Sequence, residues 1–438
     1  MQHAGYDKRT VNAWAMYDWA NSAYSLVITS TLFPIYFNAI TGGGNTRVEF
    51  LGMSFNSDAL QSYSISFAFL LIAFINPLLS AIADFSGRKK PFMYFFCFLG
   101  SLACSSLFFF ESLETLWIGI TGTILAAVGY AGSIVFYNAY LPEIAAPKFQ
   151  DKVSAKGFSF GYLGSSLLLI FSLTMVLFPA WYGGIENGSA IRLAFLLVGV
   201  WWFGFAQITF KRLPGNNERR SGGNYIFAGY VELKKVWYEL RHTSRLKRFL
   251  LAFFLYNLAV QTVMYVATLF GASELKLDSS VLIATILVIQ FVAIIGAGIF
   301  SRLSAHFGNI SALSINLAAW VAVCIGAYFC DKKYGVDVQL FFILLGAGVG
   351  MVMGGVQSLS RSTYSKLLPA TRDHASYFSF YDVCDKLGTV IGTFVFGYVI
   401  ELTGSMRNSI IILCFFFILG LISLLRVGKQ GQLQAITE

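Results

Sequence analysis

Three ionisable residues in one apolar stretch have the types and spacing to do chemistry inside a membrane. Lys386 follows Asp382 by four residues, which places an acid and a base on one face of a helix, and Asp385 is predicted on another face. A charge is costly in hydrocarbon, so each side chain needs a partner or a water-filled cavity. Lys386 either binds an anionic group of a small molecule, exchanging partners as a cavity opens and closes, or only neutralises the acid and fixes helix packing.

Four uncharged polar residues fall at a similar depth when about 1.5 Å is allowed per helical residue. They are Asn21 and Tyr24 in the first apolar stretch, and Asn257 and Gln261 in the seventh. Together with Lys386 they are predicted to form a polar ring that binds one small molecule.

Asp18 is the one acid within the first apolar stretch. A partly buried carboxylate can carry a coupling proton, so Asp18 is a predicted coupling residue. Asp18 lies close to the predicted membrane surface, however, where a bond to nearby backbone or to a cation of a cytoplasmic loop also explains it. Both alternatives stay open.

A short polar loop between the second and third apolar stretches supplies the first candidate gating residues, Asp84, Gly87 and Arg88. Gly87 can take a backbone conformation that is closed to other residues. Asp84 can accept hydrogen bonds from a neighbouring helix start, and the cations hold the loop at the cytoplasmic face.

Three more gating residues are predicted at the same face. Gln357 and Arg361 close the tenth apolar stretch, and Arg361 is predicted to be a gate or an interface anchor instead of a substrate ligand. Glu143, which follows Leu141-Pro142 in the loop after the fourth stretch, is its candidate partner.

Membrane helices must position all of these residues. Hydrophobic residues make up 56% of the 438 residues and charged residues 12%, whereas soluble domains carry about 25% charged residues. The predicted spans, each near the length of about 20 residues that crosses a bilayer, are 14–39, 62–83, 91–110, 115–138, 157–179, 190–210, 247–270, 281–302, 311–329, 338–359, 376–400 and 407–426. The fold class is therefore an all-α membrane protein with twelve transmembrane helices. The start of the chain does not resemble a removable signal peptide, so the first helix is expected to stay.

Lysine and arginine residues predict the orientation. One side of the predicted topology, with both termini, holds 24 of the 31, and the other side holds 6, so both termini are predicted in the cytoplasm. Ten of the 24 lie between Lys211 and Arg248. That polar connection divides the chain into an N-terminal six-helix bundle (1–211), a cytoplasmic linker (212–246) and a C-terminal six-helix bundle (247–438). The net charge of +9 is expected to contact anionic membrane lipids and not nucleic acid.

Other motifs argue against an enzyme or a metalloprotein. The six cysteines and four histidines are scattered, without the spacing of a metal site or a disulfide framework, and no cofactor is expected. Gly346, Gly350 and Gly354 recur every four residues inside an apolar stretch and are predicted to line one helix face for close packing. Since nothing resembles an ATP site, transport would be driven by gradients.

The two halves repeat one another faintly. Tyr17-Asp18-Trp19-Ala20 corresponds to Tyr256-Asn257-Leu258-Ala259, and the segment from Ser304 to Asn309 is a degenerate copy of the segment from Asp84 to Lys90. Such a repeat predicts a parallel duplication with a central site between the halves.

Several motifs spread over most of the chain resemble one family. They are YDWANSAY at Tyr17 to Tyr24, the D-x-x-G-R-K loop from Asp84, YNAYLPEIA at Tyr137 to Ala145, FLYN with Gln261-Thr262, and GGVQSLSRS at Gly354 to Ser362 followed by Lys386. The loop looks like the signature of the major facilitator superfamily, and the set is similar to its vacuole-effluxer branch. That branch includes the autophagy-related fungal amino-acid effluxer and many bacterial relatives.

The resemblance implies a major facilitator fold of two six-helix bundles and alternating access. It also implies a secondary active transporter that moves a small polar metabolite such as an amino acid, with efflux across a bacterial plasma membrane favoured. A monomer is expected, with a small-molecule substrate, membrane lipids and a coupling proton as partners. Family members often carry Asp-Gly after the Tyr-Asn of span seven, and this chain has Leu258-Ala259 there. If that acid helps to couple ions elsewhere in the family, coupling in this chain must rest on Asp18, Asp382 or Asp385, or be absent.

Three other functional classes have less support from the sequence. A non-transporting or lipid-translocating membrane protein with the same fold is the main alternative, and a lateral opening lined by polar residues would indicate it. An ion channel lacks support because no ring of charges or carbonyl-rich filter sequence is present. An enzyme lacks support because no nucleophile, base and orienting group share a recognisable arrangement.

Overall fold

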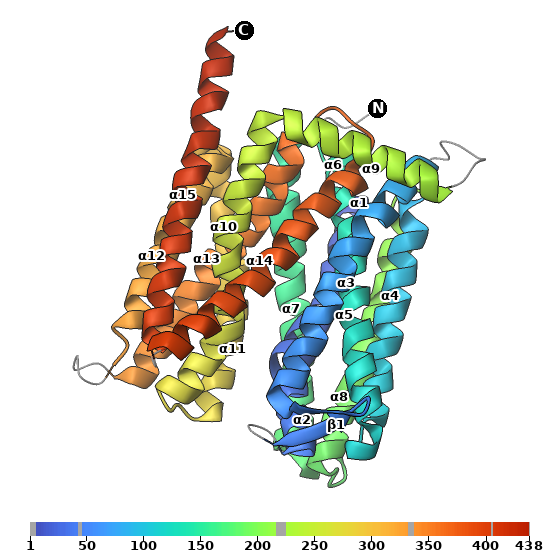
Figure 1. Cartoon of the computed structure of the whole chain (residues 1–438), viewed down its shortest axis with the longest axis vertical. Helices are drawn as coiled ribbons and strands as arrows, with labels where there is room; N and C mark the ends of the chain where they lie inside the picture. Colours follow the sequence, from blue (N-terminus) through green and yellow to red (C-terminus); the bar gives the residue numbers. More distant parts are fainter. Residues whose placement is uncertain (1–5, 43–45, 216–224, 332–336, 404–405, 438) are drawn as a thin grey trace. The chain divides into compact units, whose positions relative to one another are not determined.

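The computed structural model describes residues 6–42, 46–215, 225–331, 337–403 and 406–437, which are almost entirely helical. Twelve helical runs in these residues are long and apolar enough to cross a membrane, which confirms the predicted number of spans. They are Lys8–Thr41, Ser57–Ser86, Lys89–Phe109, Leu113–Ile144, Pro147–Leu177, Asn187–Arg212, Ser244–Glu274, Ser280–Phe307, Asn309–Tyr328, Val338–Leu367, His374–Thr403 and Met406–Val427. Figure 1 shows the helices along the chain, coloured from blue to red.

Most of these runs are longer than the stretches predicted from hydropathy. The α-helices are α1 (Lys8–Ala23), α2 (Phe33–Thr41), α3 (Ser57–Ser86), α4 (Lys89–Ser106), α5 (Leu116–Ala139), α6 (Leu141–Ile144), α7 (Gln150–Leu177), α8 (Asn187–Arg212), α9 (Tyr225–His242), α10 (Ser244–Leu269), α11 (Ser279–Phe307), α12 (Asn309–Tyr328), α13 (Val338–Leu367), α14 (His374–Thr403) and α15 (Met406–Thr437). A 30-residue helix such as α3 is about 45 Å long, whereas the hydrocarbon core is about 30 Å thick. The polar ends of such helices therefore extend past the hydrocarbon.

The first span is one continuous helical run with a widened middle. A π-helix, η1 (Tyr24–Leu32), joins α1 to α2. The Thr31 hydroxyl donates to the Leu26 carbonyl five residues earlier, at 2.8 Å. Pro34, near the start of α2, has no N–H to donate to the preceding turn. In a widened turn, the carbonyl oxygens that would otherwise lack a donor because of the proline can accept from other N–H groups. A second π-helix, η6 (Phe270–Glu274), ends the seventh span, which is the counterpart of the first in the repeat.

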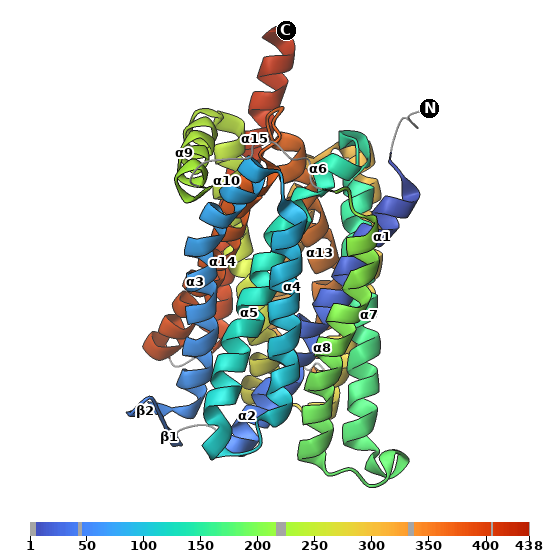
Figure 2. The ribbon, with the colours of Figure 1, turned by 90° about the vertical axis from the view of Figure 1, so that its right-hand side faces the viewer.

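A small β-hairpin follows the first span, which the sequence did not predict. Strand β1 (Arg47–Phe50) pairs antiparallel with β2 (Met53–Asn56). Leu51 and Gly52 form the turn with φ of 51° and 74°, the positive values that a tight two-residue hairpin requires. Figure 2 shows the hairpin beside the lower end of α3, where that helix begins.

The predicted short loop between the second and third spans is confirmed. Helix α3 ends at Ser86 and α4 begins at Lys89, so two residues connect them. Gly87 has φ of 70°, the left-handed conformation that glycine adopts at low cost. Its N–H and that of Arg88 donate to the last carbonyls of α3, at 3.2 Å and 2.9 Å.

Contacts divide the chain into two compact units. The N-terminal unit contains Lys8–Ala139 and Phe160–Tyr230, and the C-terminal unit contains Tyr140–Ser159 and Val231–Glu438 with the first residues of the chain. The segment Tyr140–Ser159, which includes α6 and the start of α7, thus packs with the spans of the second half. The predicted boundaries, 1–211, 212–246 and 247–438, divide the chain by sequence and stay a prediction.

A glycine stripe on α13 confirms the predicted close packing. Gly346, Gly350 and Gly354 face α11, so that a Cβ on Gly350 would stand 3.0 Å from Ile289 Cα and against its carbonyl oxygen. A Cβ on Gly354 would likewise press on the Ala293 carbonyl oxygen. Backbone approaches of this kind hold membrane helices together in the absence of a hydrophobic driving force.

Gly354→Ala is expected to destabilise the protein by about 1–3 kcal/mol, because a methyl group forced into a well-packed interface displaces backbone. Thermal unfolding in detergent measures this. Gly298→Ala is the matched control, since Gly298 lies on α11 with no atom within 4 Å of its Cβ position. Equal melting temperatures for the two variants would contradict the packing role of Gly354.

Candidate functional site

Lys386 lies at the centre of a buried ionic cluster in the C-terminal unit. Its Nζ donates to Asp385 Oδ2 at 2.6 Å and lies 3.6 Å from Asp382 Oδ1. Two amides of α10 bind the other oxygen of the same carboxylate, Asp385 Oδ1, from Asn257 Nδ2 at 2.8 Å and Gln261 Nε2 at 3.1 Å. The ionic cluster of Lys386, Asp385 and Asp382, with the two amides bound to it, therefore brings together five of the predicted site residues.

Lys386 pairs with both acids of α14, including Asp385, which was predicted on another face of the helix. Although the two residues are adjacent on α14, the long lysine side chain reaches back to Asp385 and approaches it more closely than Asp382. Spacing of i, i+4 fixes only the Cβ positions, whereas the flexible stem of lysine decides which carboxylate it meets.

Small residues position the ionic cluster by letting α14 approach α10. A Cβ on Gly388 would stand 3.4 Å from the Leu258 backbone nitrogen, and one on Gly392 would stand against the Leu258 carbonyl oxygen and the Thr262 hydroxyl. Thr389 Oγ1 donates to the Asp385 carbonyl oxygen at 2.9 Å, within α14. The close approach places the amides of α10 within hydrogen-bonding distance of Asp385.

The ionic cluster carries more acid than base. One ammonium and two carboxylates give it a formal charge of −1 when all three groups are ionised. The side chains of Lys386 and Asp382 are 8% and 4% exposed, and that of Asp385 is 19% exposed. Because a buried charge must be compensated, this arrangement can accept a proton or a cationic group more readily than a further anion.

Asn21 and Tyr24 belong to the N-terminal unit, where they are buried. The Tyr24 ring packs against Tyr130 and Trp202, with centroids 5.3 Å and 6.0 Å apart. Asn21 is fully buried, and the described part of the chain provides no hydrogen-bond partner for its Oδ1 or Nδ2. Leaving an amide unpaired in a span costs stability, so Asn21 remains a candidate for a functional contact.

Asp18 joins two of the sequence motifs inside the N-terminal unit. Tyr137, from the YNAYLPEIA motif on α5, donates its hydroxyl to Asp18 Oδ2 at 2.7 Å. The Trp14 ring stacks on the Tyr137 ring at 4.4 Å, and its Nε1 donates to the Tyr137 carbonyl oxygen at 3.0 Å. Asp18 is thus tied to another helix, which the sequence did not predict.

Arg361 holds the start of α7 within the C-terminal unit. Its Nε and Nη2 donate to the hydroxyl and the carbonyl oxygen of Ser154, both at 2.9 Å. Its guanidinium lies 4.1 Å from the centre of the Phe158 ring, and Ser154 Oγ donates to the Ser358 carbonyl oxygen at 2.8 Å. Ser154 is therefore a partner of Arg361 that the sequence did not predict. The role of Arg361 as a gate or an anchor stays a prediction.

A second connection at the start of α7 centres on Asp151, another residue that sequence reasoning missed. The Asp151 carboxylate accepts from Ser304 Oγ at 2.7 Å, Asn309 Nδ2 at 2.8 Å and Lys366 Nζ at 2.6 Å. Lys366 also donates to Asn309 Oδ1 at 2.9 Å. The degenerate repeat from Ser304 to Asn309 thus supplies hydrogen-bond donors for an acid.

The other predicted gating residues have these surroundings. Glu143, on α6, pairs with His374 at the start of α14, with Oε1 and Nδ1 3.0 Å apart. Gln357 is half-buried on α13, one turn before Arg361, and Asp84 is 1% exposed near the end of α3. Their gating roles stay predictions.

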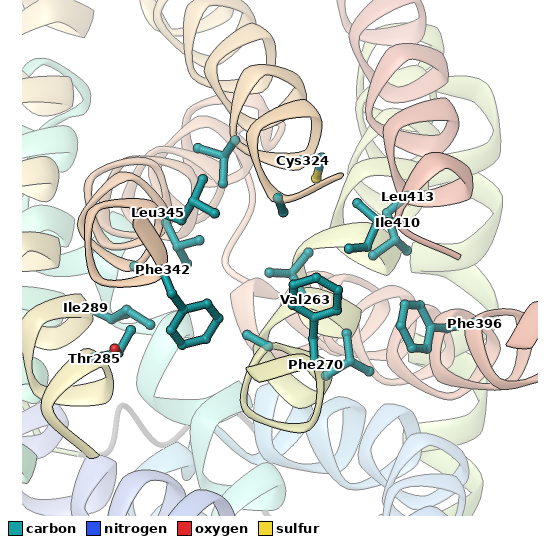
Figure 3. Close-up of a pocket in the computed structure, with 16 residues that line it drawn as sticks. Val263, Phe270, Thr285, Ile289, Cys324, Phe342, Leu345, Phe396, Ile410 and Leu413 are labelled. Carbon is teal, nitrogen blue, oxygen red and sulfur yellow. The ribbon is translucent and has the colours of Figure 1, made fainter. Parts of the chain in front are cut away.

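A cavity of about 70 Å³ lies within the C-terminal unit, apart from the ionic cluster. Figure 3 shows its aliphatic and aromatic lining, which includes Val263, Phe270, Phe342 and Leu413. Val263 is two residues from Gln261, so the two side chains point to opposite sides of α10. The lining offers no charged group, and this cavity is therefore not the site that the sequence predicted for a polar molecule.

Comparisons with known proteins agree with the motifs. The sequence model of one family, described as "Vacuole effluxer Atg22 like", matches residues 6–435. The "Uncharacterized MFS-type transporter YxiO" of Bacillus subtilis (strain 168) is 30% identical over 421 residues, which cover 96% of this chain and 95% of the relative.

Solved structures share the fold at low sequence identity. The human organic anion transporter MFSD10 (TETRAN) is similar with a TM-score of 0.70 and 15% identity, over 95% of this chain and 99% of that chain. The major facilitator superfamily transporter FucP, in the outward conformation, has a TM-score of 0.67 and 14% identity, over 96% of this chain and 99% of that chain. The predicted fold class is thereby confirmed.

Proposed function

Because this chain belongs to the Atg22-like vacuole effluxer family of major facilitator transporters, and not to a family of enzymes, we propose that it is a secondary active transporter that exports a small zwitterion, an amino acid in the first instance, by alternating access. The ionic cluster of Lys386, Asp385 and Asp382 carries this proposal.

A zwitterion matches the groups of the ionic cluster. Its carboxylate can accept from Lys386, and its ammonium can take over the pairing of the lysine with Asp385. The amides of Asn257 and Gln261 already bind that carboxylate and hold it in place. Charged pairs are then exchanged instead of broken, which keeps the cost of buried charge low. A neutral sugar would bring no charges for these pairs.

Asp385 is the proposed coupling residue. It is the most exposed of the three ionisable groups and shares its carboxylate between Lys386 and two amides. Protonation of Asp385 would remove the charge that pairs with the substrate ammonium, so a proton and the substrate would occupy this place in turn, as proton-driven export requires. Asp382 and Asp18 are the alternative coupling residues. Asn21 and Tyr24 stay candidate substrate contacts of the N-terminal unit.

Asp151 and Arg361 are proposed to hold the inner gate shut. Asp151 lies in the first turn of α7 and binds Ser304 of α11 and Lys366 of α13. Arg361 of α13 binds Ser154, one turn later on α7. These contacts lie within the C-terminal unit, and α7 then continues into the N-terminal unit. Asp84, Gly87, Arg88, Glu143 and Gln357 are proposed to take part in the same gate. Release of α7 from these partners would open the cytoplasmic side.

Asp151→Asn is expected to loosen this gate, because it leaves the Lys366 ammonium without a carboxylate. Losing a hydrogen bond between charged groups costs about 1.5–3 kcal/mol, so the open population should rise at least roughly tenfold. The measurement is the rate at which a water-soluble maleimide labels Ala155→Cys, a position that is 5% exposed. Lys366→Arg keeps the charge and serves as the control. An unchanged labelling rate would remove Asp151 from the gate.

The proposed location is the bacterial plasma membrane, with both termini in the cytoplasm. Support comes from the uneven distribution of 24 against 6 basic residues between the two sides and from the Bacillus relative. Export as the direction is supported only by the description of the family, and a monomer is proposed from the superfamily.

Thermal stabilisation of the purified protein by amino acids, dipeptides, sugars and nucleosides tests the proposed function. A ligand that binds the folded state adds about 2.7 kcal/mol to the free energy of unfolding at 100 times Kd, by mass action, and so raises the melting temperature. Stabilisation by one or more amino acids supports the proposal. If sugars or nucleosides stabilise and amino acids do not, the cargo is wrong. If no soluble compound does, lipid translocation becomes the better reading.

A further inference from the structure

Helix α9 combines a buried face with an exposed aromatic face. Val236 and Leu240 are 0% and 5% exposed on its buried side. The rest of its surface carries four large rings, here called the aromatic stripe: Phe227, Tyr230, Trp237 and Tyr238, which are 67%, 59%, 53% and 64% exposed. Trp237 lies at the edge of this stripe, where its ring also packs against the Phe380 ring of α14, with centroids 5.6 Å apart. The spacing of the four rings over three helical turns places them on one face. So much exposed aromatic surface on one helix indicates a binding surface.

Cations lie within the aromatic stripe. Lys234 and Arg241 are exposed and share its face, because they follow Tyr230 and Trp237 by four residues. Aromatic rings mixed with lysine and arginine are typical of the membrane–water interface, where the rings lie at headgroup level and the cations meet anionic lipid.

The chain holds α9 at the membrane surface. Thr243 alone separates the end of α9 at His242 from the start of α10, a membrane span, at Ser244. Figure 1 shows α9 crossing the ends of α10 and α14 at a steep angle to both. A surface so close to the lipid favours a bilayer over a soluble partner, and the charge of the stripe complements anionic headgroups.

Two polar side chains beside the buried face of α9, the exposed Lys235 and the half-buried Glu239, bind the start of α14. Lys235 Nζ donates to Asp373 Oδ2 at 3.1 Å, and the Tyr377 hydroxyl donates to Glu239 Oε2 at 2.8 Å. Hydrogen bonding to Glu232, together with Asp373, raises the pKa of the Lys235 ammonium above its ordinary value, so this side chain is charged at neutral pH. Helix α14 carries Lys386, and a force on α9 therefore acts on the span that holds the ionic cluster.

We propose that α9 lies in the headgroup layer of the cytoplasmic leaflet and binds anionic lipid through the aromatic stripe, Lys234 and Arg241. This contact steadies the first turns of α14. The surface is separate from the site proposed for the transported molecule, and its test needs no substrate.

The test is fluorescence quenching of the full-length protein in bilayers that contain brominated lipid, either phosphatidylglycerol or phosphatidylcholine at the same fraction. The contribution of Trp237 is the difference between the wild type and Trp237→Phe. We expect both lipids to quench it and the anionic lipid to quench it more strongly. Near a membrane surface one cation contributes about 1 kcal/mol, or roughly fivefold local enrichment of anionic lipid.

The double variant Lys234→Gln/Arg241→Gln should reduce the quenching by the two lipids to equal values. Arg47→Gln/Lys276→Gln, which removes two exposed cations from other parts of the chain, is the charge-matched control and should leave the preference unchanged. Hydrogen exchange at the start of α14 should slow in anionic bilayers for the wild type and not for the double variant. Quenching of Trp237 by aqueous iodide and by neither lipid would overturn the proposal, and equal quenching of the wild type by both lipids would overturn its anionic part.

Discussion

Lys386→Met is expected to abolish transport of whichever compound stabilises the wild type, and to lower the stability of the protein. The substitution leaves Asp382 and Asp385 without their buried cation, and breaking a buried pair costs about 3–5 kcal/mol. The loss of a contact with a charged substrate group weakens binding by about 1.5–3 kcal/mol, or roughly 10- to 150-fold. Melting temperature and uptake into proteoliposomes measure the two effects separately.

A double variant decides between the two roles that the sequence leaves open for Lys386. In Lys386→Met/Asp385→Asn the ionic cluster loses one positive and one negative charge, so much of the stability should return. If Lys386 contacts the substrate, exchange of labelled for unlabelled substrate, which Asp385→Asn alone should retain, stays absent although the protein is stable. If this exchange returns with stability, the lysine only neutralises its neighbours and the proposed site is wrong. Lys247→Met, at an exposed lysine near the start of α10, is the control and should behave as the wild type.

Asp385→Asn is expected to uncouple transport from the proton gradient. Asparagine keeps the size of the side chain and one oxygen for the amides of Asn257 and Gln261, which donate to Asp385 at 2.8 Å and 3.1 Å. It cannot take up a proton. Exchange of labelled for unlabelled substrate should therefore continue, whereas accumulation against a concentration gradient should fall to the level of passive equilibration.

Proton movement gives an independent measurement of the same variant. A pH-sensitive dye inside proteoliposomes should respond to substrate with the wild type and not with Asp385→Asn. Asp382→Asn is the matched control, because this carboxylate lies farther from Lys386, at 3.6 Å instead of 2.6 Å, and it should retain most of the accumulation. Undiminished accumulation by Asp385→Asn would exclude Asp385 as the coupling residue and turn attention to Asp382 or Asp18.

Local patterns predicted the structure well where the physics is local. Gly87 was predicted in a conformation that other residues avoid, and it has φ of 70°. The glycine stripe on α13 was read from a spacing of four, because residues four apart share a helix face. The π-helix η1 was not predicted, since it depends on which N–H groups donate hydrogen bonds to the carbonyl oxygens before Pro34. The hairpin after the first span was also missed.

Contacts between residues that are far apart in the sequence cannot be predicted from such local patterns. Asp151 and Lys366 are 215 positions apart, and Asp18 and Tyr137 are 119 positions apart. Each of these side chains looks like an ordinary polar residue near the end of a span. The choice between Asp382 and Asp385 as the nearer partner of Lys386 also depended on a flexible side chain and on the depth at which α10 meets α14.

The sequence by itself determined the twelve spans, their family motifs and the residues that carry charge into the membrane, because hydropathy and helical periodicity act along the chain. Only the tertiary structure decided that Asn257 and Gln261 meet Asp385, that Ser154 and Asp151 hold the start of α7, and that α9 exposes one aromatic face. These contacts join helices that are far apart in sequence, and their geometry depends on how small residues let those helices approach.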